Sequence, residues 1–182
     1  MSAHEFEFNH ERSLEAAAHL LRGAGGTLDR TKLISLLYIA ERELLVESGV
    51  SLTGDFYEAT PLGPVLGSIE GRLEADPQWH RYIRTVGDDY CLLANPGDDS
   101  LSRRMMEKLD DVSARFALHT GRELAEHTRG FGEWIKHWAG PIPLRDVVFA
   151  MGEGDELLQE IREKEAERRH MAKLFEGLGE PS

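Results

Sequence analysis

The sequence predicts a mainly α protein with a minor β component: a multi-helix domain that carries a small β-hairpin. Apolar residues recur with helical spacing in most segments between the glycines and prolines. One pair of β-rich runs, residues 82–86 and 90–93, flanks Gly87-Asp88-Asp89, as in a hairpin. The chain of 182 residues has the usual length of one domain and can bury a core without disulfides or metals.

The first two helices are predicted from their caps and apolar spacing. Asn9 is a favourable N-cap for a helix that ends at Gly23, and its apolar residues share one face: Leu14, Ala17, Ala18 and Leu21. Asp29 can cap a second helix that ends at Gly49. Residues 33–40 are apolar almost all round, so we expect this helix at the centre of the fold.

The next segments predict a turn, a short strand and a third helix. Residues 53–55 form the turn, and residues 56–59 the extended piece. Gly63 and Pro64 would open the helix, because proline suits the first helical position. The order helix, helix, strand, helix, hairpin is that of a winged helix-turn-helix, so the N-terminal half is expected to be winged-helix-like.

The C-terminal half is predicted to contain five further helical segments. Ser100 would cap the first, and shorter helices would follow at residues 122–129, 132–138 and 144–151. A last helix begins at Asp155, buries its first turns and then becomes densely charged, with favourable i, i+4 pairs: Glu160 with Lys164 and Glu165 with Arg169. We therefore divide the chain into a domain at residues 9–151 and a charged helical extension at residues 152–182.

The charge balance makes nucleic acid an unfavoured partner. The chain has 21 basic and 33 acidic residues, a net charge of −12, whereas nucleic-acid binding depends on clustered basic residues that neutralise phosphates. No apolar run approaches the roughly 18 residues that a membrane span requires. The N-terminal residues are polar and acidic, unlike a signal peptide. With its single cysteine, Cys91, the chain is expected in the cytoplasm and away from membranes.

No motif in the sequence predicts catalysis or a cofactor. Phosphate-binding loops, dinucleotide glycine motifs and zinc-protease helices are missing, and the eight histidines lack metal-ligand spacing. Cys91 beside a histidine would be a nucleophilic pair, but a cysteine within an apolar strand favours packing. The pairs Asp88-Asp89 and Asp98-Asp99 occur at turns, where aspartate is favoured for local hydrogen bonds. We predict no catalytic, cofactor-binding or metal-binding residues, and thus not an enzyme.

Three motifs between residues 32 and 65 resemble those of the Panacea-domain family of SocA-like antitoxins and phage-associated proteins. They have the forms K-L-x-x-L-L-Y-x-A, G-x-x-x-T-G-D-x-Y-x-A and G-P-V. Here they are Lys32, Leu33, Leu36, Leu37, Tyr38 and Ala40; Gly49, Thr53, Gly54, Asp55, Tyr57 and Ala59; and Gly63, Pro64 and Val65. A looser likeness at residues 124–128 and Trp134 extends the resemblance over about residues 14–151.

The resemblance implies an antitoxin that neutralises a cognate protein toxin, encoded in an adjacent gene, by direct binding. A SocA-like member works instead as an adaptor that delivers its toxin to an ATP-dependent protease. No catalytic residues come with the resemblance. The segment Arg129-Gly130-Phe131-Gly132 departs from the family's spacing, and the helix after Asp155 lies outside the pattern.

The predicted partner contacts lie in three regions: residues 53–64, the aromatic stripe of residues 131–138, and the last helix. The predicted residues are Asp55, Tyr57, Gly63, Pro64, Trp134 and Trp138. Asp55 would either pair with a basic toxin surface, which speeds association, or form an Asx-type turn. Tyr57 would pack its ring and expose its hydroxyl. The tryptophans would either clamp the core, the favoured interpretation, or anchor an interface.

The alternative function is a DNA-binding, winged-helix transcriptional autoregulator. Its recognition helix would be residues 63–76, where Arg72 is the only basic residue and stands among acidic ones. This reading requires a basic strip around the hairpin, formed by Arg81, Arg84, Arg103 and Arg104. The electrostatics of the helix argue against DNA contact.

Overall fold

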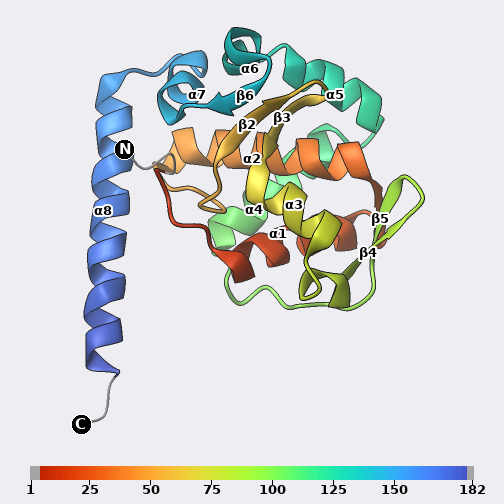
Figure 1. The fold of residues 1–182 in the computed structure, drawn as a ribbon, viewed down its shortest axis with the longest axis horizontal. Coiled ribbons are helices and arrows are strands. Elements are labelled where there is room, and N and C mark those ends of the chain that lie inside the picture. The colour runs from red at the N-terminus through yellow and green to blue at the C-terminus, as the bar shows by residue number, and fades with distance from the viewer. Residues whose placement is uncertain (1–4, 180–182) are drawn as a thin grey trace.

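The computed structural model describes residues 5–179 and confirms a mainly helical fold with minor β structure (Figure 1). The N-terminal elements are α1 (His10–Gly23), β1 (Thr27–Asp29), α2 (Arg30–Ser48), β2 (Tyr57–Thr60), β3 (Gly63–Leu66), α3 (Gly67–Ala75), the 3₁₀ turn η1 (Trp79–Arg81), β4 (Ile83–Val86) and β5 (Asp89–Leu92). The C-terminal elements are α4 (Arg103–Arg115), α5 (Gly121–Arg129), α6 (Gly132–His137), β6 (Gly140–Ile142), α7 (Leu144–Ala150) and α8 (Asp155–Leu178).

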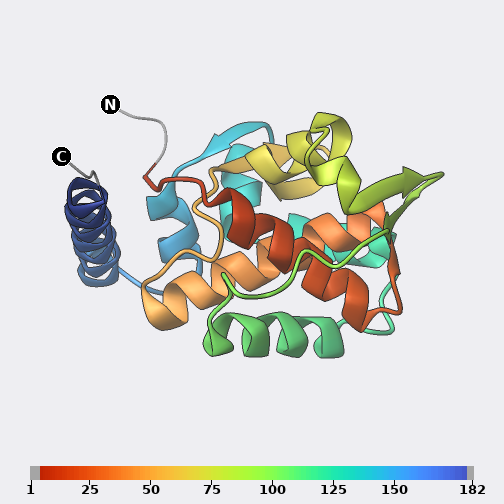
Figure 2. The same cartoon turned by 90° about the horizontal axis from the view of Figure 1, so that it is seen from below.

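Helix α2 runs through the middle of the molecule, with α1, α4, α5 and β3 packed around it (Figures 1 and 2). The side chain of Asp29 accepts a hydrogen bond from the backbone N–H of Lys32 (2.9 Å), and Gly49 ends the helix in the left-handed conformation. The predicted apolar run is buried, including Leu33, Leu37 and Ala40. Each large side chain buried there contributes about 1.5–3 kcal/mol, so α2 organises the core.

The first sheet has the strand order β1-β5-β4, and its β4–β5 hairpin turns at Gly87, as predicted. Along the chain, α1, β1, α2, α3, β4 and β5 follow the order of a winged helix. The hairpin of β2 and β3 is inserted before α3. The predicted order of helix, helix, strand, helix and hairpin is therefore only partly found, because β1 precedes α2 and the single strand expected before α3 is the hairpin of β2 and β3.

The second sheet, β3-β2-β6, corrects two predictions. Gly63 and Pro64 do not open a helix: they lie in β3, with Pro64 opposite Ala59 of β2, and α3 begins only at Gly67. Because β3 is an edge strand, the missing N–H of Pro64 removes no essential ladder bond. Residues 140–142, for which no strand was predicted, pair with β2 as β6.

One further helix start was predicted wrongly. Helix α4 is capped by Ser102, whose hydroxyl accepts a hydrogen bond from the N–H of Met105 (3.2 Å). Ser100 instead donates its backbone N–H to Glu15 of α1 (2.8 Å). Both serines suit an N-cap, so the sequence alone did not distinguish them. The apolar residues in and beside α4 are buried nonetheless: Leu101, Met105, Leu109, Val112 and Phe116.

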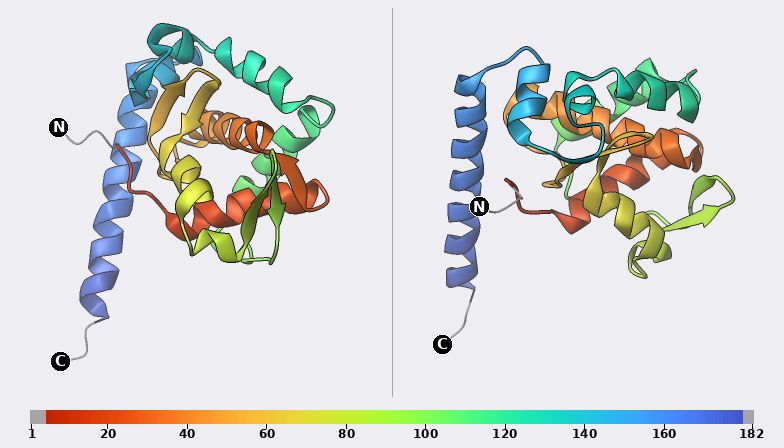
Figure 3. Two further views of the ribbon diagram at one scale, coloured as in Figure 1. Left: turned by 45° about the vertical axis from the view of Figure 1, so that its right-hand side comes forward. Right: turned by 45° about the horizontal axis from the view of Figure 1, so that its top comes forward.

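Helix α8 lies along one side of the molecule, and its C-terminal half projects beyond the other elements (Figures 1 and 3). Its first half is attached to the body: Leu158 and Ile161 are buried, and Lys164 donates to the backbone oxygen of Ser48 (2.9 Å). The predicted pair Glu160–Lys164 forms at 2.6 Å, as does the predicted pair of Glu165 with Arg169 at 3.0 Å. Residues 180–182 of the predicted extension lie outside the described residues.

Candidate functional site

The middle of α2 carries a carboxylate, Glu41, that is completely buried. One carboxylate oxygen accepts hydrogen bonds from the hydroxyls of Ser51 (2.6 Å) and Tyr57 (3.0 Å). The other accepts from the backbone N–H and the hydroxyl of Thr53, both at 2.9 Å. These four bonds attach the turn before β2 to the central helix.

Burial raises the pKa of Glu41 above its ordinary value, although the hydrogen bonds from Ser51, Thr53 and Tyr57 oppose the rise. The pKa of Tyr57 is also well above its ordinary value, because the phenol is buried and faces Glu41. The expectation that Tyr57 exposes its hydroxyl is therefore wrong. Its role is internal: it satisfies a buried carboxylate.

A second buried polar group links α2 to α6. Glu133 is buried and accepts two hydrogen bonds from the guanidinium of Arg42, at 2.6 and 3.0 Å. The hydroxyl of Tyr38 donates to the same carboxylate (3.1 Å). The guanidinium carbon of Arg42 also lies 3.8 Å from the centre of the Phe131 ring, a cation–π contact. These contacts fix the position of the short helix α6.

Asp55 is only 2% exposed, so the prediction that it lies at an exposed turn is wrong. Its carboxylate accepts hydrogen bonds from the backbone N–H groups of Phe56 (2.8 Å), Ser68 (3.0 Å) and Ile69 (2.9 Å). The last two are unsatisfied donors at the start of α3, where a negative charge also favours the helix dipole. The local hydrogen-bonding interpretation of Asp55 is the one the structure supports. Gly54 beside it adopts a positive φ of 72°.

The remaining motif residues hold the β2–β3 hairpin against α5 and α6. A Cβ on Gly63 would lie 2.7 Å from the hydroxyl oxygen of Thr128 in α5, so only glycine fits there. Pro64 is buried in β3. Trp134 is partly buried, and its indole N–H donates to the backbone oxygen of Thr60 (2.8 Å). Trp134 therefore acts as the predicted clamp.

Trp138 differs from the other predicted contact residues, because its side chain is 69% exposed. It ends α6 with a φ of 37°, a strained value for a non-glycine residue. Ile135, one turn earlier, is also exposed. Of the six predicted contact residues, Trp138 is the one with a largely accessible side chain.

Three residues of these buried polar groups were not predicted from the sequence: Glu41, Arg42 and Glu133. The first two stand together at the end of an almost continuous apolar run, and a charged pair inside a buried helix indicates internal partners. Glu133 carries no comparable pattern, since its burial depends on how α6 packs against α2.

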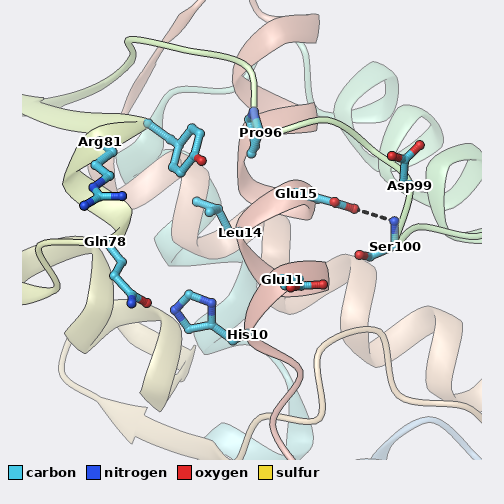
Figure 4. A pocket seen from close by; sticks show the side chains of 10 residues that line it. His10, Glu11, Leu14, Glu15, Gln78, Arg81, Pro96, Asp99 and Ser100 are labelled. Carbon is cyan, nitrogen blue, oxygen red and sulfur yellow. Dashed lines mark hydrogen bonds between the residues drawn. The ribbon is translucent and has the colours of Figure 1, made fainter. Parts of the chain in front are cut away.

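A polar hollow of about 460 Å³ lies between α1, η1 and the loop before α4 (Figure 4). Arg81 and Gln78 lie on one side of it and Asp99 on the other, with Glu11 and Glu15 from α1 between them. The carboxylate of Glu15 already accepts a hydrogen bond from the backbone N–H of Ser100. Within residues 5–179, no group of three or more His, Cys, Asp or Glu side chains is arranged to hold a metal ion.

The arginines required for a DNA-binding strip have separate neighbours. Arg81 lines the hollow of Figure 4, whereas Arg84 lines another pocket together with Glu74. Arg103 pairs with Glu107 of its own helix (2.8 Å), and Arg104 donates to the backbone oxygen of Glu47 (3.1 Å). This dispersion argues against a continuous basic surface around the hairpin.

Comparison with known proteins identifies the family. The profile described as "Antitoxin SocA-like, Panacea domain" matches residues 33–135, more than half of the chain. The chain therefore belongs to the SocA-like, Panacea-domain antitoxin family. No match was found among curated proteins or solved structures. In the part of the chain that the structure describes, no helix is long and apolar enough to cross a membrane.

Proposed function

We propose that this protein is a non-enzymatic antitoxin that neutralises a cognate protein toxin by binding it directly. The observation that carries the proposal is the family match, which covers most of α2, both buried polar groups and most of α6. The toxin would be the product of an adjacent gene, and both proteins would act in the cytoplasm. Proteolytic delivery of the toxin is a variant of the same binding function, in which an ATP-dependent protease is a further partner.

The proposed arrangement has a rigid body at residues 9–151 and an extension at residues 152–182. The motif residues give the body its shape, since Asp55, Tyr57 and Gly63 are buried within it. The contact with Arg42 holds Glu133 in α6, and α6 presents Ile135 and Trp138 to solvent. Exposed tryptophans on a well-fixed element are typical anchors of protein interfaces.

A growth assay tests this function. Each gene flanking that of the chain is expressed alone and then together with the chain. We expect one product to arrest growth alone and to be harmless in the presence of the chain. If no flanking product is toxic, or if the chain fails to relieve the arrest, the antitoxin proposal is wrong. Repeating the assay in cells that lack ATP-dependent proteases separates inhibition from delivery, because delivery requires the protease.

The α6 contact has its own test. The double substitution Ile135→Ala with Trp138→Ala should weaken toxin binding at least tenfold, since anchor residues typically cost more than 1.4 kcal/mol when truncated. Leu118→Ala is the matched control, because Leu118 is 97% exposed and lies between α4 and α5. Equal toxin affinity in calorimetry for the double variant and the control would exclude α6 from the interface.

A further inference from the structure

The projecting half of α8 carries a stripe of exposed apolar side chains. Met171, Leu174, Phe175 and Leu178 have the spacing i, i+3, i+4 and i+7, which places them on one face of the helix. All four are exposed, Phe175 by 67% and Leu178 by 81%. We call these four residues the distal stripe. An exposed apolar surface of this kind on a soluble protein marks an interaction site.

The distal stripe is well placed to reach a partner. The first half of α8 is fixed by Leu158 and Ile161, and the guanidinium of Arg162 donates to Glu5 (2.8 Å). The C-terminal half of α8 leaves the body, as Figures 1 and 3 show. A two-turn apolar face on a helix with a fixed base is suited to lie in a groove of another protein.

We infer that the distal stripe docks into an apolar groove with an acidic rim on the cognate toxin. This docking rests on the proposed function, because the toxin supplies the groove. The toxin would accept the stripe as two turns of helix, with Phe175 and Leu178 as the deepest side chains.

The charges around the distal stripe support an acidic rim. Residues 166–178 contain Arg168, Arg169 and Lys173 against Glu167 and Glu176, a net charge of +1. The whole chain carries −12, so the remaining residues carry −13. Arg168 and Arg169 pair with Glu165, but Lys173 makes no ion pair within the described residues. Lys173 is therefore free to meet a carboxylate at the edge of a groove.

The same observations disfavour two other occupants. Two copies meeting stripe to stripe would bury on the order of 1,000 Å², below the about 1,200–2,000 Å² of stable interfaces. An anionic membrane is an extended surface that would also face the body, which carries −13, and would repel it, whereas the rim of a groove meets only the projecting half of α8. A groove that surrounds the helix on several sides buries more surface for the same four side chains.

Affinity measurements on the intact chain test the inference, with the flanking-gene toxin as the probe. The variant Phe175→Ser with Leu178→Ser should bind the toxin at least tenfold more weakly. Lys173→Glu should weaken binding several-fold. Val86→Ser with Leu118→Ser is the matched control, because both side chains are exposed apolar residues elsewhere, and it should bind like the wild type. Thermal melting should be unchanged in all variants.

The outcomes are distinguishable from failure of the proposed function. If the wild type binds the toxin and the Phe175/Leu178 variant binds equally well, the inference is wrong and the antitoxin function stands. If the wild type does not bind, both are wrong. Sedimentation equilibrium that shows a wild-type dimer lost in this variant would assign the stripe to a second copy and overturn the inference. Stripe-dependent binding to phosphatidylglycerol vesicles would overturn it in favour of a membrane.

Discussion

Glu41 joins the central helix to the turn that carries the family motif, and its protonation is coupled to folding. Burial raises its pKa in the folded state, so the folded protein binds this proton more tightly than the unfolded chain. The stabilisation from this proton is complete below the ordinary pKa of 4.5 and is lost as the pH rises through the folded pKa. Glu41 thus lowers stability toward neutral pH, unlike a salt-bridged carboxylate.

A comparison with Glu41→Gln isolates this effect. The free energy of unfolding of the wild type minus that of Glu41→Gln should decrease as the pH rises above 4.5, and it should level off above the folded pKa. At low pH Glu41 is protonated, and its hydroxyl oxygen can still accept a hydrogen bond, whereas the amide nitrogen of the glutamine accepts none, so the variant should be less stable at low pH by about 1–3 kcal/mol. Urea denaturation from pH 4.5 to 8 measures both. If the difference in the free energy of unfolding instead grows with pH, the pKa of Glu41 is lowered in the folded state.

The contact between Arg42 and Glu133 gives a second prediction. Arg42→Met would leave the carboxylate of Glu133 buried and without its cation, which typically costs about 3–5 kcal/mol. Arg42→Met with Glu133→Gln should recover part of that loss, because the buried group is then neutral. Denaturant unfolding of both variants gives the comparison. If the single variant loses less than about 1 kcal/mol, the pair does not hold α6 in place.

At the level of elements, α3 depends on a residue outside it. Asp55 supplies the carboxylate that accepts the N–H groups of Ser68 and Ile69, because Leu66 at the N-cap position offers no side-chain hydrogen bond. This cap comes from a turn that is eleven residues earlier than Leu66 in the chain. The aspartate of the second motif, Asp55, thus has a structural role, because it caps the helix that follows the third motif.

Removal of this cap should lower the stability of the protein rather than change a binding surface. Asp55→Ala should cost about 1–2 kcal/mol of stability, and Asp55→Asn less, since the amide oxygen still accepts one bond. Charge reversal with Asp55→Lys should unfold the protein rather than slow association. Melting temperatures from circular dichroism check the order. A stable Asp55→Lys variant with altered toxin kinetics would restore the exposed-turn interpretation.

The sequence predicted those elements whose caps and apolar spacing are local. Helices α1, α2, α5 and α8 have the predicted beginnings within one residue, since Asn9, Asp29 and Thr120 make their own capping bonds and Asp155 begins α8. Strands β3 and β6 were missed because Gly-Pro sequences indicate a turn or a helix start, whereas pairing with β2 decides their conformation. The candidate contacts were less predictable, because the burial of Asp55 and Tyr57 depends on partners distant in the chain.

For the whole molecule, the charge distribution favours the antitoxin over the DNA-binding autoregulator. The winged-helix order is present, yet α3 has a single arginine, Arg72, which pairs with Asp76 (2.6 Å). The chain carries −12 overall. We therefore expect no shift of its own promoter DNA at 150 mM salt, because there are too few free cations to release counterions. An electrophoretic shift with micromolar or tighter affinity would favour the autoregulator.

The most direct test of the antitoxin account is the mass of the complex formed when the chain and its flanking-gene toxin are co-expressed. The account predicts that the two proteins elute together in size-exclusion chromatography with light scattering, at a fixed stoichiometry, whenever the chain relieves growth arrest. Relief of growth arrest without any complex, with the chain bound instead to promoter DNA, would contradict neutralisation by direct binding.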